Sequence, residues 1–216
     1  FLNFSPDHLD RHGGVGGYFN AKQRLFTLGN SERNIICVDS KEGELLFNLL
    51  ETNELSRGTN LAIASKKNIS NFSWSVFIKK GFLVEWKNGK QIASININSD
   101  LTELKSYNFQ NVCAAYAAAR ILSLAPKVIV KGFESFQGLP HRNQIISEKD
   151  GVKYVNDSKA TNVEAAINSI SQYENIHLIL GGLAKKGGIS KLLENISGVK
   201  KVYLIGDSAK DFSEKL

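Results

Sequence analysis

The chain has 216 residues, 42% of them hydrophobic and 22% charged, and a formal net charge of +6. This is the composition of an ordinary globular protein with one large or two small cores. Its lysines occur as scattered pairs separated by acidic residues, which favours a solvated surface and predicts no nucleic-acid partner. No run is apolar and long enough for a transmembrane helix, and the first residues lack the pattern of a signal peptide, so no membrane insertion is expected.

The cysteines and the two ends of the chain bear on its compartment and extent. Cys37 and Cys113 lie far apart in the sequence and form no CxxC motif, which predicts free thiols in a reducing cytoplasm. The chain contains no methionine, not even at position 1, and its last residues have a helical pattern. We therefore expect the 216 residues to be the middle part of a longer protein.

The first half of the chain predicts both helices and strands. Apolar residues at helical spacing favour a helix at 15–27, and Asn88-Gly89 between two apolar runs is a strong signal for a β-hairpin. The apolar segment 111–130 is interrupted by Arg120 and Pro126 and predicts a buried helix followed by a strand. In chain order, the expected elements are the end of a strand at 1–4, the helix at 15–27, a strand at 34–38, antiparallel strands at 72–78, 81–86 and 91–97, and a helix at 108–124.

A change of composition separates the two halves. The segment 131–140 contains two glycines and a proline and has no hydrophobic period, so we place a domain boundary there, between residues 1–137 and 138–216. Beyond it, strands alternate with helices, which favours a parallel, doubly wound α/β sheet. The expected elements are strands at 152–156, 176–180 and 201–205 and helices at 162–172, 190–195 and 209–216.

A polar block, N-D-S-K-A-T-N at 156–162, follows an apolar run at 151–155 that we interpret as a buried strand. In open α/β sheets, ligands bind at the carboxyl ends of the strands, and the N-terminus of the following helix favours anions. The simpler interpretation is a turn and a helix N-cap formed by Asp157, Ser158 and Thr161. Lys159 has no capping role, and this favours a functional site.

A second candidate site lies near the start of the chain. The stretch S-P-D-H-L-D-R-H at 5–12 contains two His and two Asp residues, which can bind divalent cations, although such a pair in a loop is more commonly a helix-entry turn. Lys22 follows between aromatic residues. It is either a lysine with a solvated ammonium group or a neutral amine that can act as a nucleophile or take up CO₂.

Two glycine-rich stretches lack a nucleotide-binding motif. Residues 182–188, G-L-A-K-K-G-G, have the glycine spacing of a phosphate loop, but Gly188 stands where a lysine should follow, and no GxxxxGK[ST] occurs in the chain. The stretch H-G-G-V-G-G at 12–17 has no GxGxxG register and predicts a flexible turn.

Taken together, these motifs resemble the Mur ligases. The resemblance covers nearly the whole chain in order, and its D-S-K-A-T-N block is similar to that of the member that adds D-glutamate. It implies an α/β fold, with part of the central ATP-binding domain at 1–137 and the first part of a Rossmann-like, amino-acid-binding C-terminal domain at 138–216. The motifs that carry it are S-P-D-H-L-D-R-H at 5–12 followed by Ala21-Lys22, N-F-Q-N at 108–111, G-L-P-H-R at 138–142, D-S-K-A-T-N at 157–162, and Gly181-Gly182 followed by Lys185.

The resemblance implies an ATP- and Mg²⁺-dependent ligase of peptidoglycan synthesis that acts in the cytoplasm as a monomer. It would join D-glutamate to UDP-N-acetylmuramoyl-L-alanine through an acyl phosphate, a reaction that depends mostly on positioning and charge neutralisation. The family's phosphate loop, an acidic Mg²⁺ ligand and the UDP-sugar domain would lie upstream of Phe1. The segment that holds the far carboxylate of D-glutamate would lie beyond Leu216, so this chain alone is expected to be inactive.

The resemblance also assigns roles to residues of this chain. His8 and Lys22, the latter as a carbamate, would hold a Mg²⁺ ion, and both would be catalytic together with Lys159, which would face the phosphates or the developing charge. The expected cofactor-binding residues are Asn111 at the adenine and Arg142 and Asp157 at the ribose and nearby nucleotide. The expected substrate-binding residues are Thr161 and Lys185, at a carboxylate of D-glutamate.

Two other functions stay open on the sequence. One is a related ligase that adds L-glutamate or a diamino acid, which the D-S-K-A-T-N block disfavours. The other is a non-catalytic module, derived from a Mur ligase, that binds a nucleotide or a partner. The coding sequence upstream of Phe1 would separate them, because a GxxxxGK[ST] motif there supports the ligase.

Overall fold

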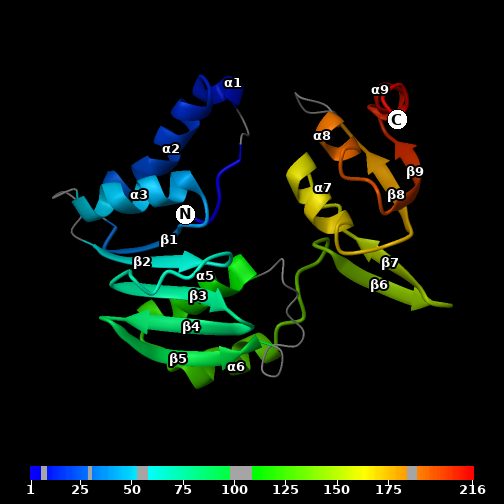
Figure 1. Cartoon of the computed structure of the whole chain (residues 1–216). Helices are drawn as coiled ribbons and strands as arrows, with labels where there is room; N and C mark the ends of the chain where they lie inside the picture. Colours follow the sequence, from blue (N-terminus) through cyan, green and yellow to red (C-terminus); the bar gives the residue numbers. More distant parts are fainter. Residues whose placement is uncertain (6–8, 29–30, 53–57, 98–108, 184–188) are drawn as a thin grey trace. The chain divides into compact units, whose positions relative to one another are not determined.

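The computed structural model describes residues 1–5, 9–28, 31–52, 58–97, 109–183 and 189–216, and it divides into two compact units, Phe1–Phe136 and Gln137–Leu216 (Figure 1). Each unit has hydrophobic clusters of its own. No helix among the described residues combines the length and the hydropathy that crossing a membrane requires.

The first unit is built on a five-stranded mixed sheet whose strands follow one another in chain order. The first three strands are parallel, and the last three are antiparallel. Asn88 and Gly89 join the last two strands with φ values of 50° and 74°, as a two-residue hairpin turn requires, so the predicted hairpin is confirmed. The strands are β1 (Arg33–Cys37), β2 (Thr59–Ala64), β3 (Trp74–Lys79), β4 (Phe82–Lys87) and β5 (Lys90–Asn96).

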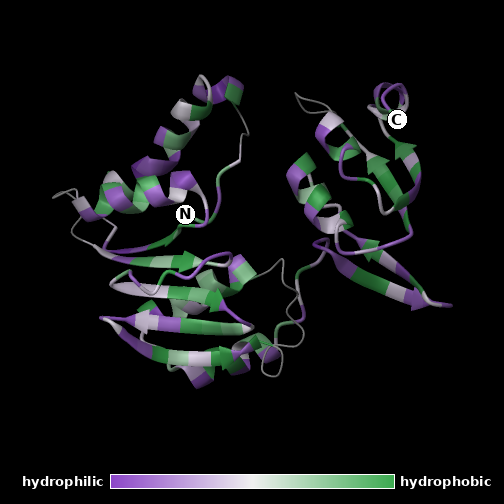
Figure 2. Ribbon diagram, in the orientation of Figure 1, coloured by the Kyte–Doolittle hydropathy of each residue, from purple (hydrophilic) through white to green (hydrophobic). Residues whose placement is uncertain are grey.

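Helices cover both faces of this sheet, which makes a three-layer α/β unit. On one face, α2 (Val15–Thr27) and α3 (Lys41–Thr52) pack against alternate strand residues such as Ile36 and Phe77. On the other face, α5 (Phe109–Ile121) packs against residues such as Leu61 and Ile63. In Figure 2, hydrophobic colour is concentrated in the strands, and hydrophilic colour recurs along α2 and α3. The short helix α1 (Leu9–His12) precedes α2.

The prediction of a strand in the last part of the apolar segment 111–130 is wrong. These residues belong to a helix, α6 (Pro126–Glu134), which also includes residues expected to lack regular structure. Pro126 lies in its first turn, where a missing N–H costs nothing, after Ala125 in an extended conformation. Ile129 and Phe133, four residues apart, pack against the same core cluster. The run Val128-Ile129-Val130 is β-branched, but this tertiary packing favours a helix.

The second unit contains two separate two-stranded sheets. One is an antiparallel hairpin, and the other is a parallel pair joined through a short helix. Cluster residues such as Ile170, Leu192 and Phe212 bring the helices onto one face of the parallel pair. The elements are β6 (Gln144–Lys149), β7 (Val152–Asn156), α7 (Val163–Ile170), β8 (Ile176–Gly181), α8 (Ser190–Leu193), β9 (Val199–Ile205) and α9 (Ala209–Ser213).

Strand β7 has the predicted bounds, but its predicted environment is wrong in two respects. It pairs antiparallel with β6 instead of belonging to a parallel sheet with β8 and β9. Its side chains are not buried either, since Val152 is 55% and Tyr154 53% exposed. The turn at Asp150-Gly151, with φ values of 53° and 76°, closes a hairpin that brings the local partner strand alongside.

The start of the chain is only partly strand-like. No strand is formed at residues 1–5, yet the amino group of Phe1 donates to the carbonyl of Ile35, and the amide of Cys37 donates to the carbonyl of Phe1. The segment therefore follows the edge of β1. The elements α3, β2 and β6 had not been anticipated from the sequence.

Candidate functional site

The polar block that follows β7 is held by the turn that precedes β6. The amide of Asn143 donates to Oδ1 of Asp157 at 2.8 Å, and the amide of Lys159 donates to the carbonyl of His141 at 3.0 Å. Asn156 Nδ2 lies 2.9 Å from Nδ1 of His141. These contacts join residues about fifteen positions apart, so the turn at 141–143 and the block at 156–159 form one structure.

Arg142 lies at the tip of this turn, between two residues in the left-handed region. His141 has a φ of 62° and Asn143 a φ of 47°, which few residues other than glycine adopt, although Asn and His do so more readily than most. The Arg142 side chain is exposed, and its backbone neighbours are those bonded to Asp157 and Lys159. The structure therefore brings Arg142, Asp157 and Lys159 together.

The block ends in the N-cap of α7. Oδ1 of Asn162 accepts a hydrogen bond of 2.8 Å from the amide of Ala165, which satisfies one of the free N–H groups of the first turn. The N-cap is thus Asn162, not Asp157, Ser158 or Thr161. Thr161 directly precedes the cap and is exposed, at a helix end whose dipole favours negative charge.

The two glycines after β8 have a structural explanation. A Cβ atom on Gly181 would collide with the carbonyl oxygen of Ile205 in β9, and Gly182 has a φ of 108°. The hydroxyl of Ser208 donates to the carbonyl of Gly182 at 2.6 Å. These contacts close the carboxyl ends of β8 and β9 against each other. Lys185 lies outside the described residues.

In the first unit, Lys22 belongs to an aromatic cluster. Its Nζ lies 4.9 Å from the centroid of the Tyr18 ring. Tyr18 stacks on Phe4 with 5.3 Å between ring centroids and also contacts the ring of His12. Lys22 is half-buried, and the aromatic rings remove part of its contact with water. His8 lies outside the described residues.

The carboxyl ends of β1 and β2 carry a second group of polar residues. Asp39 accepts hydrogen bonds from the amide and hydroxyl of Ser65, both at 2.8 Å, and from the amide of Lys66 at 3.1 Å. Burial by itself would raise the pKa of Asp39, but these hydrogen bonds outweigh it and lower the pKa below its ordinary value of 3.8. In its carboxylate form, Asp39 therefore holds the carboxyl ends of the two parallel strands β1 and β2 together.

Gln110 connects this edge to the helix that carries Asn111. Its Nε2 donates to Sγ of Cys37 at 3.2 Å, and its Oε1 accepts from Asn3 Nδ2 at 3.0 Å. Burial, with a smaller effect of the Asp39 charge, raises the pKa of the Cys37 thiol. Through Gln110, the start of α5 and residues 1–5 therefore meet at the carboxyl end of β1. Asn111 is exposed in the first turn of α5.

The described residues do not form a metal site by themselves. In the parts of the chain that the structure describes, no three His, Cys, Asp or Glu side chains are grouped so that they could hold an ion. These residues alone therefore do not provide the ligands that the expected Mg²⁺ ion needs. The contact recorded for the Lys22 ammonium group is the Tyr18 ring.

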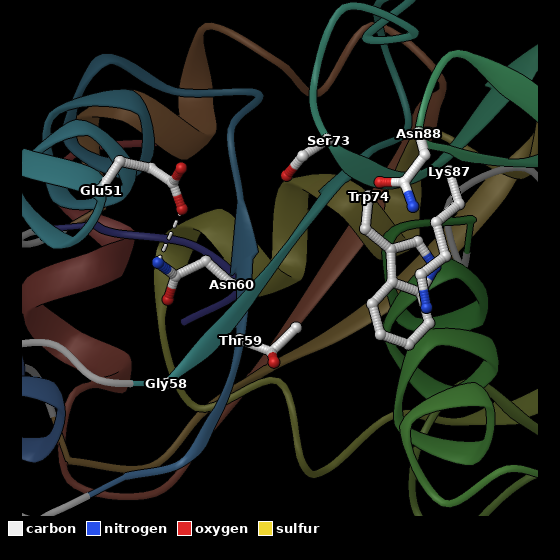
Figure 3. A pocket seen from close by; sticks show the side chains of 8 residues that line it. All are labelled: Glu51, Gly58, Thr59, Asn60, Ser73, Trp74, Lys87 and Asn88. Carbon is white, nitrogen blue, oxygen red and sulfur yellow. Dashed lines mark hydrogen bonds between the residues drawn. The ribbon is translucent and has the colours of Figure 1, made fainter.

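A pocket of about 390 Å³ lies at the opposite edge of the sheet, where β2 and β3 begin (Figure 3). On one side of it, Asn60 Nδ2 donates to Oε1 of Glu51 at 2.8 Å. On the other side, Nζ of Lys87 lies 3.7 Å from the centroid of the Trp74 ring. Ligands of parallel sheets bind at the carboxyl ends of the strands, and this pocket lies at the other end of the strands from the polar group around Asp39.

The sequence missed two residues that organise the site. Asn143 binds Asp157, and Gln110, next to Asn111, binds Cys37 and Asn3, yet neither has a side chain typical of catalysis. Asn143 follows a turn with Gly138 and Pro140, and an Asn in such a turn signals a left-handed conformation. Gln110 lies within the N-F-Q-N motif at 108–111, but no local pattern indicates its contacts, because its partners lie 73 and 107 residues away.

Comparison with known proteins leads to one family. Residues 1–119 match the model of the Mur ligase middle domain. UDP-N-acetylmuramoylalanine–D-glutamate ligases from Cereibacter sphaeroides and Roseobacter denitrificans are each 48% identical to the chain, over 99% and 100% of its length. The chain spans 46% of the length of each of these relatives.

Solved structures of low identity share the fold. A pseudomurein peptide ligase type C from Methanothermus fervidus has a TM-score of 0.67 at 15% identity, over 99% of this chain and 49% of that chain. UDP-N-acetylmuramate-alanine ligase from Thermotoga maritima has a TM-score of 0.64 at 16% identity, over 99% and 47%. Because the middle-domain model matches more than half of the chain, this protein belongs to the Mur ligase family.

Proposed function

We propose that the chain is part of a cytoplasmic, ATP-dependent ligase that joins D-glutamate to UDP-N-acetylmuramoyl-L-alanine in peptidoglycan synthesis. The observation that carries the proposal is the D-S-K-A-T-N block, which is hydrogen-bonded to His141 and Asn143 on either side of Arg142 and caps α7. The relatives from Cereibacter and Roseobacter, named as D-glutamate ligases, support it at 48% identity. Since the chain spans 46% of their length, the complete activity belongs to a longer protein.

In the second unit, Arg142 and Asp157 bind the nucleotide. Oδ1 of Asp157 accepts a hydrogen bond from the amide of Asn143. This bond orients the carboxylate and leaves Oδ2 to accept hydrogen bonds from ribose hydroxyls. The exposed guanidinium of Arg142 provides fixed positive charge and a planar surface next to it. Asn111, at the start of α5, contributes an amide that can hydrogen-bond to adenine.

Lys159 and Thr161 serve the chemical step and the incoming amino acid. The ammonium group of Lys159 faces the phosphates and neutralises charge that develops when the substrate carboxylate attacks the γ-phosphate of ATP. This attack breaks the bond to ADP, which leaves, and forms the acyl phosphate. The amine of D-glutamate then attacks the acyl carbon, phosphate leaves, and the amine proton passes to solvent. Thr161, at the N-terminus of α7, holds a carboxylate of D-glutamate with the help of the helix dipole, and Lys185 contributes a second positive charge.

In the first unit, Lys22 reacts as a neutral amine with CO₂ to give a carbamate and a proton. Lys22 is half-buried beside the Tyr18 ring, and its carbamate oxygens together with His8 would be ligands for Mg²⁺. The bound metal would neutralise phosphate charge. The described residues supply only Lys22 to this site, and the remaining ligands come from His8 and from parts of the longer protein.

The test is a ligation assay with the complete protein encoded by the gene that contains this chain. We expect ADP and phosphate release that requires UDP-N-acetylmuramoyl-L-alanine and D-glutamate, and no turnover when L-glutamate replaces D-glutamate. Nucleotide binding without ligation would instead indicate the non-catalytic module. The 216-residue chain alone serves as the control and should release no ADP; substrate-dependent release by it would contradict the proposal that other parts of the protein are needed.

A further inference from the structure

Asn143 makes three hydrogen bonds that connect three parts of the second unit. Its amide donates to Oδ1 of Asp157 at 2.8 Å. Its side-chain Nδ2 donates to Oε1 of Gln172 at 2.6 Å, and its Oδ1 accepts from the hydroxyl of Tyr173 at 2.5 Å. The turn that carries Arg142 is thus bonded to the Asp157 loop through the backbone and to the end of α7 through the side chain.

The partners at the end of α7 are themselves fixed. Nε2 of Gln172 donates to the carbonyl of Asn168 at 2.6 Å, and the amide of Tyr173 donates to the carbonyl of Ile170. The Gln172 amide therefore has its donor directed to the helix and its acceptor directed to Asn143. Ile170 is buried in the core of the unit, so the bond from Tyr173 to its carbonyl connects the turn to the core.

The side-chain bonds also stabilise an unfavourable backbone conformation. Asn143 has a φ of 47° and His141 a φ of 62°, so the Arg142 turn places two non-glycine residues in the left-handed region. Such conformations persist when surrounding contacts determine them. With Asn143 held by Gln172 and Tyr173, its N–H is directed at Asp157, and the orientations of Arg142 and Asp157 become linked.

We propose that Asn143, held by Gln172 and Tyr173, is a positioning residue for nucleotide binding. It sets the orientation of the Asp157 carboxylate and of the Arg142 turn without contacting the nucleotide itself. The proposal rests on the proposed function only where it names the nucleotide; the positioning of Asp157 and Arg142 can be measured separately.

The first experiment measures positioning directly in the 216-residue chain. Amide hydrogen exchange by NMR reports on the Asn143 and Lys159 amides, which are bonded to Asp157 and His141. Asn143→Gly keeps the backbone conformation available and removes the side-chain bonds, and Tyr173→Phe removes one donor. We expect exchange at these two amides to become roughly 2- to 10-fold faster, the factor that one neutral hydrogen bond represents.

The chain offers matched controls for both changes. Asn175 also has a positive φ, of 55°, so Asn175→Gly is the same substitution at another left-handed position. Tyr154 is 53% exposed, so Tyr154→Phe removes a hydroxyl from a surface tyrosine. Neither control should change exchange at the Asn143 and Lys159 amides. Unchanged exchange in Asn143→Gly and Tyr173→Phe would overturn the proposal.

The second experiment separates positioning from general stability in the complete protein. Asn143→Gly and Tyr173→Phe should raise the Kd and KM for ATP by roughly 2- to 10-fold and leave the KM for D-glutamate and kcat within error. Arg142→Ala and Asp157→Ala are the reference variants and should weaken ATP binding more. A fall in kcat and a rise in the KM for both ATP and D-glutamate, together with a lowered Tm, would mean that Asn143 has a merely structural role.

The failure of each proposal has its own signature. If Arg142→Ala and Asp157→Ala leave the Kd for ATP unchanged, the nucleotide site is wrongly assigned, and the hydrogen-exchange experiment still decides whether Asn143 positions the turn. If these reference variants weaken ATP binding while Asn143→Gly and Tyr173→Phe do not, the site is right and the positioning role of Asn143 is wrong.

Discussion

Nε of Arg120 lies 2.7 Å from Oε2 of Glu85, a carboxylate whose side chain is completely buried. The same carboxylate accepts hydrogen bonds from the hydroxyl of Tyr116 and from Nε1 of Trp74. The hydrogen bond to Glu85 raises the pKa of Arg120, and burial followed by the Glu85 charge raises that of Tyr116. This network fixes α5, and with it Asn111, against β3 and β4.

Arg120→Met should destabilise the first unit by about 3–5 kcal/mol, because it leaves the Glu85 charge buried without its ion-pair partner. Urea unfolding followed by tryptophan fluorescence measures this, since Trp74 and Trp86 both lie in the first unit. When Glu85 has been replaced by glutamine, Arg120→Met no longer leaves a buried carboxylate without its ion-pair partner. The same change should then lower the free energy of unfolding clearly less. Equal costs in the two backgrounds would show that the ion pair is not responsible.

Asp39 should make the first unit sensitive to acid. Its pKa is lowered in the folded state from 3.8 in the unfolded state, so the unfolded chain binds more protons between these two values. The contribution to the free energy of unfolding is therefore fully present above pH 3.8 and is lost as the pH falls through the folded pKa. Asp39→Asn should flatten this decline in urea titrations followed by tryptophan fluorescence.

Ser65→Ala provides a second test of the same carboxylate. It removes the hydroxyl donor but keeps the backbone donors of Ser65 and Lys66, so its decline in acid should lie between those of the wild type and Asp39→Asn. If all three proteins lose stability in parallel below pH 3.8, another group is responsible for the acid sensitivity.

Asn162→Ala should weaken the N-terminus of α7. Loss of the cap on the Ala165 amide costs about 0.5–2 kcal/mol in comparable helices, and hydrogen exchange at Ala165 should become faster. Asn162→Asp keeps an acceptor and adds negative charge at the positive end of the helix, so it should preserve protection. Loss of protection in both variants would mean that the side-chain cap is not what stabilises the turn.

Lys22→Ala in the complete protein should nearly abolish ligation, because the proposed carbamate cannot form. Acetate at high concentration should partly restore the rate, since a short carboxylate can take the place of the carbamate oxygens. Lys22→Arg keeps the cation beside Tyr18 but cannot form a carbamate, so it should be as inactive as the alanine variant. An active arginine variant would return Lys22 to the role of a cation over an aromatic ring, worth about 0.5–1 kcal/mol at an exposed site.

Local patterns in the sequence determined those elements whose signals are local. Helix α2 has the predicted bounds Val15–Thr27, β7 has the predicted bounds Val152–Asn156, and Asn88-Gly89 closes the predicted hairpin. Hydrophobic period and turn chemistry act over a few residues, so they can be read from neighbours in the chain. The linear D-S-K-A-T-N block likewise identified the candidate site and the family.

The tertiary structure decided what depends on distant partners. A run of β-branched residues became α6 because Ile129 and Phe133 pack on one core cluster, and β7 joined β6 instead of a parallel sheet. The link between Arg142 and Asp157 rests on Asn143, whose side-chain partners lie about thirty residues away. Burial and hydrogen bonds between segments far apart in the chain form only in the folded state. Because they depend on distant residues, no local pattern in the sequence indicates them.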